Sequence, residues 1–254
     1  MTSRTPSDPA RTLLLLWGRQ DVPGRSGLHL RAIVSAGIEL ADAEGLAAVS
    51  MRRVSDRLGV GAMSLYTHVP GKTELTELMS DAALQGLYSH VDEPADQGDW
   101  QAGLTLIARR NIDLWLAHPW LLDLPGYRPS VGPHLSDKYE AELRPLDGIG
   151  LTDLEMDATL TLVLTHAQGV ARSLIQQRQD TTTSTDADWW STVAPVLEQV
   201  MHAERFPVSG RVGAAAGQAF QAPSSPEHAL GFGLGRILAG VTDLLRGRPT
   251  GVIG

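Results

Sequence analysis

The spacing of apolar residues is helical along almost the whole chain, and this feature restricts the fold more than any other. From Leu30 to Ala41 the apolar residues recur at intervals of three and four, which places them on one face of a helix. No segment shows convincing alternation of the kind that indicates a half-buried strand. We therefore predict an all-α protein. The predicted helices span about residues 30–44, 51–58, 62–68, 72–82, 100–117, 134–146, 153–179, 187–203 and 226–246.

One polar stretch divides the chain into two parts. Residues 89–99 contain Pro94 and Gly98 and lie between two helical patterns, so this stretch is the best candidate for a domain boundary. We expect an N-terminal extension at 1–27, a first domain at 28–88 and a second domain at 95–250.

Capping residues mark the start of two long helices in the second domain. Thr152 and Glu155 have the spacing of a capping box. Ser225 followed by Pro226 is a typical cap and first helical residue. The Gly- and Ala-rich stretch 206–223 that precedes this cap is predicted to be irregular.

Composition excludes several classes of protein. The chain has no cysteine, which removes disulfide frameworks, thiolate nucleophiles and Cys-ligated zinc, and fits a reducing cytoplasm. No stretch approaches the roughly 20 apolar residues of a membrane span. The apolar run from Leu13 to Trp17 is too short for a signal peptide, and we expect a short helix or an ordered arm there.

Net charge differs between the two ends of the chain. The formal net charge is −8, but residues 1–72 carry nine Lys and Arg against six Asp and Glu. The first part is therefore at +3 and the remainder at −11. A basic head on an acidic body is typical of a DNA-binding module joined to a domain that does not bind DNA. Chance is the alternative explanation.

Residues 50–72, SMRRVSDRLGVGAMSLYTHVPGK, predict a helix-turn-helix. Ser50 caps a first short helix, Gly59 ends it, and a second short helix follows after three residues. Val54 and Leu65 have the spacing to hold the two helices together, and the second helix would enter the major groove. A small hairpin that only forms core is the alternative. The residues expected to be exposed are Arg52, Arg53, Ala62, Met63, Ser64, Tyr66, Thr67, His68 and Lys72.

Residues 28–80 resemble the DNA-binding domain of the tetracycline-repressor (TetR) family. The likeness is carried by ADAEGLAAVSMRRVSDRLGV, MSLYTHVPGK and ELTELM, whose motifs are specific in combination. The resemblance implies that Arg52 reads a base and that Ala62, Met63 and Ser64 lie nearest the base edges. It also implies that Tyr66, His68 and Lys72 contact phosphates. Ala62 departs from the family pattern because its side chain is too short to hydrogen-bond to a base.

The second domain resembles the C-terminal domain of the tetracycline repressor itself, through AHPWLLDLPG and FGLGRILAGVTDLLRG. The resemblance implies a homodimer in which the helices at about 153–179 and 226–246 form a four-helix interface. Gly231 and Gly235 fit the close approach of another helix. The alternative is that both helices are ordinary core. In the extension, Arg19 and Arg25 would reach a minor groove, or lie in a solvated linker.

The resemblance also implies a small-molecule effector, bound within the second domain, that releases the protein from DNA. A histidine that holds a magnesium–drug chelate in the tetracycline repressor has no counterpart in residues 122–127. We therefore predict no metal and no cofactor, and an apolar or aromatic effector other than tetracycline. The candidate pocket residues are Trp115, Trp120, Tyr127, Tyr139, Met156 and His166, each of which is alternatively ordinary core.

The sequence lacks the common motifs of enzymes. It has no nucleophile elbow, no phosphate-binding glycine loop after a strand and no HExxH. We expect a repressor that binds a palindromic operator as a homodimer, with no membrane partner. An activator and a sequence-tolerant architectural protein of the same fold are the alternatives.

Overall fold

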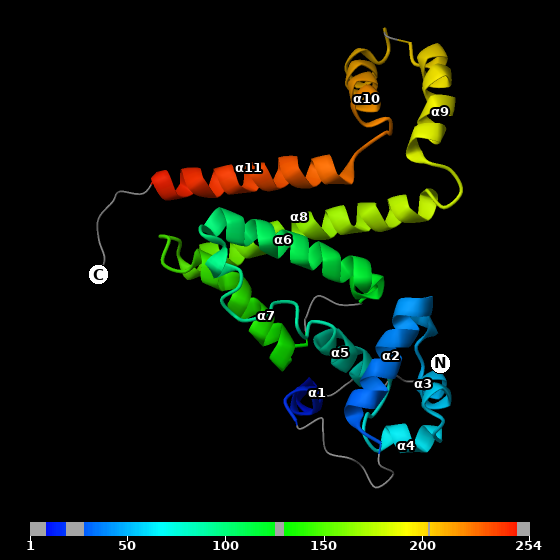
Figure 1. The fold of residues 1–254 in the computed structure, drawn as a ribbon, viewed down its shortest axis with the longest axis vertical. Coiled ribbons are helices and arrows are strands. Elements are labelled where there is room, and N and C mark those ends of the chain that lie inside the picture. The colour runs from blue at the N-terminus through cyan, green and yellow to red at the C-terminus, as the bar shows by residue number, and fades with distance from the viewer. Residues whose placement is uncertain (1–8, 19–27, 125–129, 203, 248–254) are drawn as a thin grey trace. The chain divides into compact units, whose positions relative to one another are not determined.

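The computed structural model describes residues 9–18, 28–124, 130–202 and 204–247, and these residues contain helices and no strand (Figure 1). The all-α prediction is confirmed. The chain divides into two compact units, residues 1–164 and 165–254. The helices are α1 (Pro9–Leu16), α2 (Leu30–Glu44), α3 (Met51–Leu58), α4 (Ala62–Tyr66), α5 (Lys72–Ala82), α6 (Trp100–Ala117), α7 (Pro133–Leu143), α8 (Asp153–Asp180), α9 (Asp186–Val200), α10 (Pro207–Phe220) and α11 (Pro226–Arg246). Short 3₁₀ helices lie at η1 (Leu46–Ala48), η2 (Ala95–Gln97), η3 (Pro119–Asp123) and η4 (Arg144–Leu146).

Helices α2 to α5 enclose the first hydrophobic core. The predicted face of α2 is buried at Ile33, Val34 and Ala41, and Leu75 and Met79 of α5 are buried in the same cluster. A Cβ added at Gly37 would lie 2.7 Å from the Met79 sulfur, so the glycine lets the Met79 side chain of α5 pack directly against α2. Leu30, Ala36, Leu40, Val49, Met51, Val54, Leu65, Val69 and Leu78 complete this core within α2–α5.

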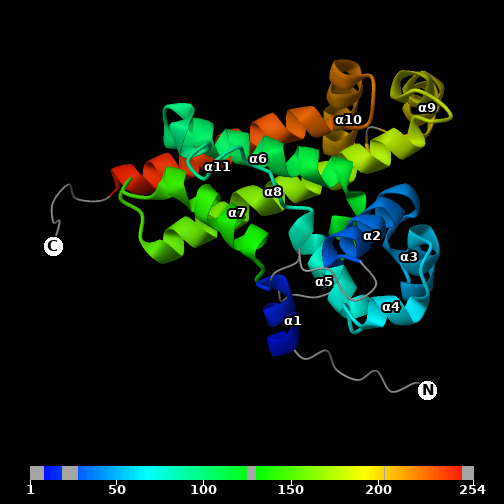
Figure 2. The ribbon, with the colours of Figure 1, turned by 60° about the horizontal axis from the view of Figure 1, so that its bottom comes forward.

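Helix α1 packs against α5, and Figures 1 and 2 both draw it beside α5 and the start of α7. Leu16 is buried in the first core, and the indole nitrogen of Trp17 donates to the Val131 carbonyl at 3.0 Å. The expected short apolar helix in the extension therefore exists and is docked. Arg19 and Arg25, the predicted minor-groove residues, lie outside the described residues.

Helix α6 follows the predicted boundary, and η3 returns the chain to α2. Asp99 caps α6 by accepting from the Ala102 amide at 2.7 Å. Beyond α6, one carboxylate oxygen of Asp42 in α2 accepts from two side chains: His118 Nδ1 and Trp120 Nε1, each at 2.7 Å. A buried tryptophan whose N–H finds an ionised acceptor is a strong local attachment, so η3 is fixed to α2.

The second unit contains the end of α8, followed by α9, α10 and α11. The prediction that 206–223 is irregular was wrong, because Pro207–Phe220 is α10. Pro207 occupies a first-turn position, three consecutive alanines follow, and the Trp190 ring covers Gly217 so closely that a Cβ there would overlap it. Packing against α9 therefore outweighs the low helix propensity of the glycines.

Helix α11 begins at the predicted cap, where Ser225 accepts from the His228 amide at 3.2 Å. The ring of His166 in α8 lies against Gly233, and its Nε2 is 3.3 Å from the Leu230 carbonyl. Gly231 and Gly235 instead face open space, with nothing within 4 Å of an added Cβ in this chain. The close approach within the chain is therefore made at Gly233 rather than at the two predicted glycines.

Candidate nucleic-acid interface and cavity

Helices α3 and α4 form a helix-turn-helix that the first core holds in place. The Ser50 side chain accepts from the Arg53 amide at 3.2 Å, and Gly59 ends α3 with a left-handed φ of 66°. Helices of eight and five residues are too short to be stable alone in water. Val54 and Leu65 are each 0% exposed, so their burial fixes the second helix against the first.

The outer face of α4 is open to solvent and includes large side chains. Met63 is 76% exposed and Tyr66 is 46% exposed. The Thr67 hydroxyl donates back to the Ser64 carbonyl at 2.7 Å and closes the last turn of α4. Ala62, Ser64 and His68 are half-buried, and Thr67 and Lys72 are exposed. Exposed apolar and aromatic side chains on so short a helix are unexplained by packing within the chain.

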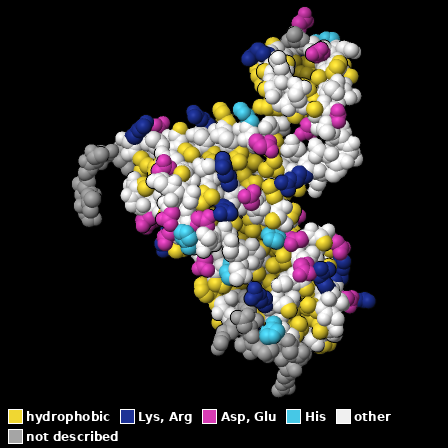
Figure 3. All heavy atoms as spheres, in the orientation of Figure 1, with side chains coloured by type: hydrophobic (Ala, Val, Ile, Leu, Met, Phe, Trp, Pro, Cys, Tyr) yellow, Lys and Arg dark blue, Asp and Glu magenta, His cyan; other side chains and the backbone are white. Residues whose placement is uncertain are grey.

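The two arginines of α3 have different surroundings. The Arg52 side chain is 89% exposed, and its nearest carboxylate, Asp56, is 3.9 Å away. Arg53 instead forms a two-pronged ion pair with Glu44 at 2.6 and 2.9 Å, and this hydrogen bonding lowers the pKa of Glu44. Arg53 therefore ties α3 to α2, whereas the guanidinium of Arg52 remains available. In Figure 3, dark blue and magenta side chains lie together at the edge where Figure 1 draws α3.

The remaining predicted phosphate contacts also differ. Lys72 is exposed, and its Nζ makes a long 3.3 Å hydrogen bond to the Leu46 carbonyl. Nε2 of His68 is buried and has no hydrogen-bond partner within the described part of the chain. In this conformation any contact from His68 to a phosphate must therefore use the other ring nitrogen.

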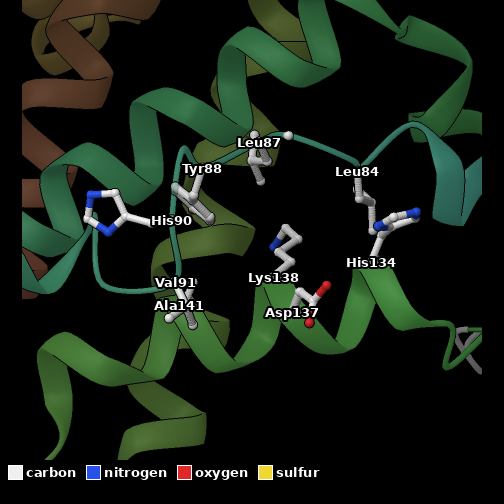
Figure 4. A pocket seen from close by; sticks show the side chains of 10 residues that line it. Leu84, Leu87, Tyr88, His90, Val91, His134, Asp137, Lys138 and Ala141 are labelled. Carbon is white, nitrogen blue, oxygen red and sulfur yellow. The ribbon is translucent and has the colours of Figure 1, made fainter.

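A cavity of about 290 Å³ lies between the segment after α5 and helix α7 (Figure 4). The segment contributes Leu84, Leu87 and Val91 as apolar lining, and Figure 4 shows the Lys138 side chain extending from α7 between these walls. The rest of the lining is Gly86, Tyr88, His90, His134, Asp137 and Ala141.

A buried carboxylate joins the two walls of this cavity. Glu142, 1% exposed, accepts from the Tyr88 hydroxyl at 2.7 Å, from the Asn111 amide at 2.6 Å and from Lys138 at 2.5 Å. Burial and the Glu142 charge raise the pKa of Tyr88, which therefore stays a hydrogen-bond donor. Two residues of the cavity lining, Tyr88 and Lys138, are therefore held by the same buried carboxylate behind it.

The predicted pocket residues lie elsewhere, and none of the described ones lines this cavity. Trp120 is in the first core, and the Tyr139 hydroxyl donates to Asp157 at 2.8 Å on the surface. His166 contacts α11, Trp115 and Met156 are half-buried, and Tyr127 lies outside the described residues. This cavity is lined instead by residues of the 84–91 segment, most of which precede the polar stretch 89–99, and by residues of α7.

Among the described residues, no group of three His, Cys, Asp or Glu side chains is arranged to hold a metal ion. None of the helices in the described ranges is both long and apolar enough to cross a bilayer.

Two protein-family models match the chain. Residues 33–79 match the model of bacterial regulatory proteins of the tetR family, and residues 93–245 match the tetracyclin repressor-like C-terminal domain. These ranges cover the helix-turn-helix and the helices after the polar boundary.

Similar proteins are transcription regulators. The chain is 41% identical over 249 residues to the HTH-type transcriptional repressor DrrR1 of Streptomyces coeruleorubidus, covering 95% of this chain and 88% of the relative. It is 30% identical to an HTH-type transcriptional regulator of Saccharopolyspora erythraea, covering 65% and 70%. The crystal structure of the TetR family protein ActR of Streptomyces coelicolor in complex with actinorhodin superposes with a TM-score of 0.69 at 26% identity, covering 85% of this chain and 95% of that one.

Proposed function

This chain belongs to the TetR family of DNA-binding transcription repressors, and we propose that it binds a palindromic operator as a homodimer and leaves it when a small molecule binds. The observation that carries the proposal is the exposed face of α4 on a closed core, at the position where the family model matches. The name of the DrrR1 relative supports repression rather than activation. We propose a first domain at 28–88 and a second at 95–250, and the separate matches at 33–79 and 93–245 support a division in this region.

We assign different roles to the exposed residues of the helix-turn-helix. The Arg52 side chain is 89% exposed and Met63 is 76% exposed, which supports base contacts from both. Tyr66, Thr67 and Lys72 suit phosphates, because they are exposed donors near the ends of α4 and α5. Ala62 and Ser64 complete the face toward the bases, and His68 contacts the DNA backbone. Arg53 acts mainly by positioning α3 through its ion pair with Glu44.

The homodimer is proposed to form through α8 and α11. Phe232 is 65% exposed and Leu244 is 42% exposed on α11, and Leu162 on α8 is 52% exposed. On α11, Gly231 and Gly235 have nothing within 4 Å of an added Cβ among the described residues. An apolar helix face with room for a close neighbour is what an isologous interface requires.

We propose that the effector occupies the cavity between the 84–91 segment and α7. Its volume suits a small organic molecule, and its lining combines apolar residues with a few polar groups. The similar ActR protein binds actinorhodin, which supports a small-molecule effector for this chain. A bacterial regulator that binds an operator would act in the cytoplasm, where the DNA lies.

Selection of bound sites from random duplex DNA tests the proposal. Enrichment of one palindrome with half-sites about one helical turn apart is the expected result. Enrichment of a single unpaired half-site would contradict the homodimer. No enrichment even at low salt would refute site-specific repression and favour a sequence-tolerant architectural protein. A variant with Arg52→Ala and Met63→Ala should lose the preference, whereas Arg57→Ala is a matched control because Arg57 is paired with Glu39 at 2.7 Å.

A further inference from the structure

The carboxylate of Asp81 in α5 caps the N-terminus of a different helix, α7. Oδ1 accepts from the Leu135 amide at 2.9 Å, and Oδ2 accepts from the His134 amide at 3.4 Å. Asp81 is only 2% exposed. Burial of a carboxylate is costly unless it is hydrogen-bonded, and here the first-turn amides of α7 supply the bonds.

Helix α7 has no cap of its own. Its N-cap residue is Gly132, which offers no side chain, and its first turn contains no acidic residue. A Cβ added at Gly132 would lie 2.3 Å from the Asp81 carboxyl carbon. Gly132 has φ −87°, a conformation open to any residue, so glycine is needed here for space. The Asp81 carboxylate therefore occupies the place where a local N-cap side chain would lie.

This cap connects the cavity to the DNA-reading helices. Helix α5 begins at Lys72 and ends at the residues that form one wall of the cavity, and α7 forms the other wall. The Glu142 network joins the walls farther along α7, and the Asp81 cap joins them at its start. Trp17 holds Val131, next to Gly132, so this junction is fixed from two sides.

We propose that Asp81 is the positioning residue through which occupancy of the cavity changes the placement of α5, and with it α4, on DNA. This inference rests on the proposed function, because it takes the cavity as the effector site. A molecule between the walls separates them, and the cap transmits the displacement of α7 to α5 as a rigid element. Coupling of this kind is reciprocal, so DNA binding in turn disfavours occupancy.

A double substitution separates capping from coupling. Asp81→Ala removes the cap and makes room at position 132. Adding Gly132→Ser then supplies a local N-cap, because a serine there can accept from the Leu135 amide, three residues on. Asp81→Ala alone should lower the melting temperature, and Asp81→Ala with Gly132→Ser should recover it while leaving α5 and α7 unconnected.

Because the effector is unidentified, a larger side chain introduced by substitution fills the cavity in its place. Ala141→Phe places a ring in the cavity from α7, and Val91→Trp does so from the opposite wall if the first variant is unstable. Affinity for the selected palindrome is measured with and without each of these filling substitutions. The two backgrounds are the native protein and the recapped protein, which carries Asp81→Ala and Gly132→Ser. We expect the filler to weaken binding about tenfold in the native protein and less than about threefold in the recapped one, within the usual range of allosteric coupling.

The outcomes are distinct. Equal weakening by the filler in both proteins would overturn the role of Asp81 while leaving an effector in the cavity intact. No weakening by folded Ala141→Phe or Val91→Trp in the native protein would overturn the inference and the assignment of the cavity together, but not operator binding. Failure to select any operator would contradict the proposed function itself, before the cap is tested.

Discussion

Replacing Lys72 by alanine tests whether α5 begins at a DNA phosphate. Lys72 is exposed, and within the described ranges its Nζ makes one long hydrogen bond, to a backbone carbonyl, so its loss should leave the fold intact. Each phosphate contact contributes about 0.9 to the slope of log affinity against log salt concentration. A homodimer carries two copies of Lys72, so the variant should lose about 1.8 from the magnitude of that slope.

The size of this effect makes it measurable. A rise in salt from about 50 to about 200 mM is a change of about 0.6 in log concentration, so it should weaken the native protein about 12-fold more than the variant. Fluorescence anisotropy on the selected duplex at four or five salt concentrations gives both slopes. The weakening should be similar for every duplex sequence, because a phosphate contact carries no base information.

A matched control is Arg57→Ala, which removes the same charge from the same domain. Arg57 is bound by Glu39 at 2.7 Å, so its removal should leave the salt slope nearly unchanged. If Lys72→Ala leaves the slope unchanged, or if both variants lower it equally, then the placement of the N-terminus of α5 on a phosphate is wrong.

Three further predictions follow from the burial and charge of single residues. Leu65→Ala should destabilise the protein by about 2–5 kcal/mol in urea unfolding, because Leu65 is 0% exposed. Met63→Ala should change the free energy of unfolding by less than about 0.5 kcal/mol, because Met63 is 76% exposed, yet it should relax base preference in a repeat of the site selection. The Ser89 amide and hydroxyl and the Arg110 guanidinium lower the pKa of Glu93 to about 2. A carboxyl whose pKa is lowered in the folded state stabilises the fold above the unfolded pKa of 4.5, and this stabilisation is lost as the pH falls toward 2. In urea titrations, Glu93→Gln should therefore be less stable than the native protein near pH 7, and the difference should shrink near pH 3.

The helices of the first domain could be predicted because each has a local signal. Ser50 marks a helix start by its capping side chain, and Gly59 and Pro70-Gly71 mark helix ends by backbone preference. The apolar spacing around Ile33 identifies the buried face. The same local logic failed for 206–223, where the decisive interaction is the Trp190 ring over Gly217, 27 residues later. Glycine counts carry no information about such a distant contact.

The exposed face of α4 could also be predicted from local signals, whereas the ion pairing of the site could not. Exposure of Met63 and Tyr66 follows from the period of α4 once Leu65 is known to be inward. The pairing of Arg53 with Glu44 depends on how α2 crosses α3, and the sequence alone does not give that crossing.

The cavity was the least predictable part. Aromatic residues were the expected lining of the effector pocket. Trp120 instead lies in the first core, where its indole nitrogen donates to Asp42. One wall of the cavity proposed for the effector lies on the irregular segment 84–91, where no periodicity identifies the side that faces inward.

The double hydrogen bond to Asp42 has a geometric consequence for how the DNA-binding helices can move. Together with the cap at Asp81, it joins α2–α5 to η3 and α7 at two separate points. A body held at two points keeps one easy motion, which is rotation about the axis through them. Figure 1 draws α4 at the end of α2–α5 that lies away from α6 and α7. A rotation of a few degrees that leaves both attachments intact would therefore displace the DNA-reading helix.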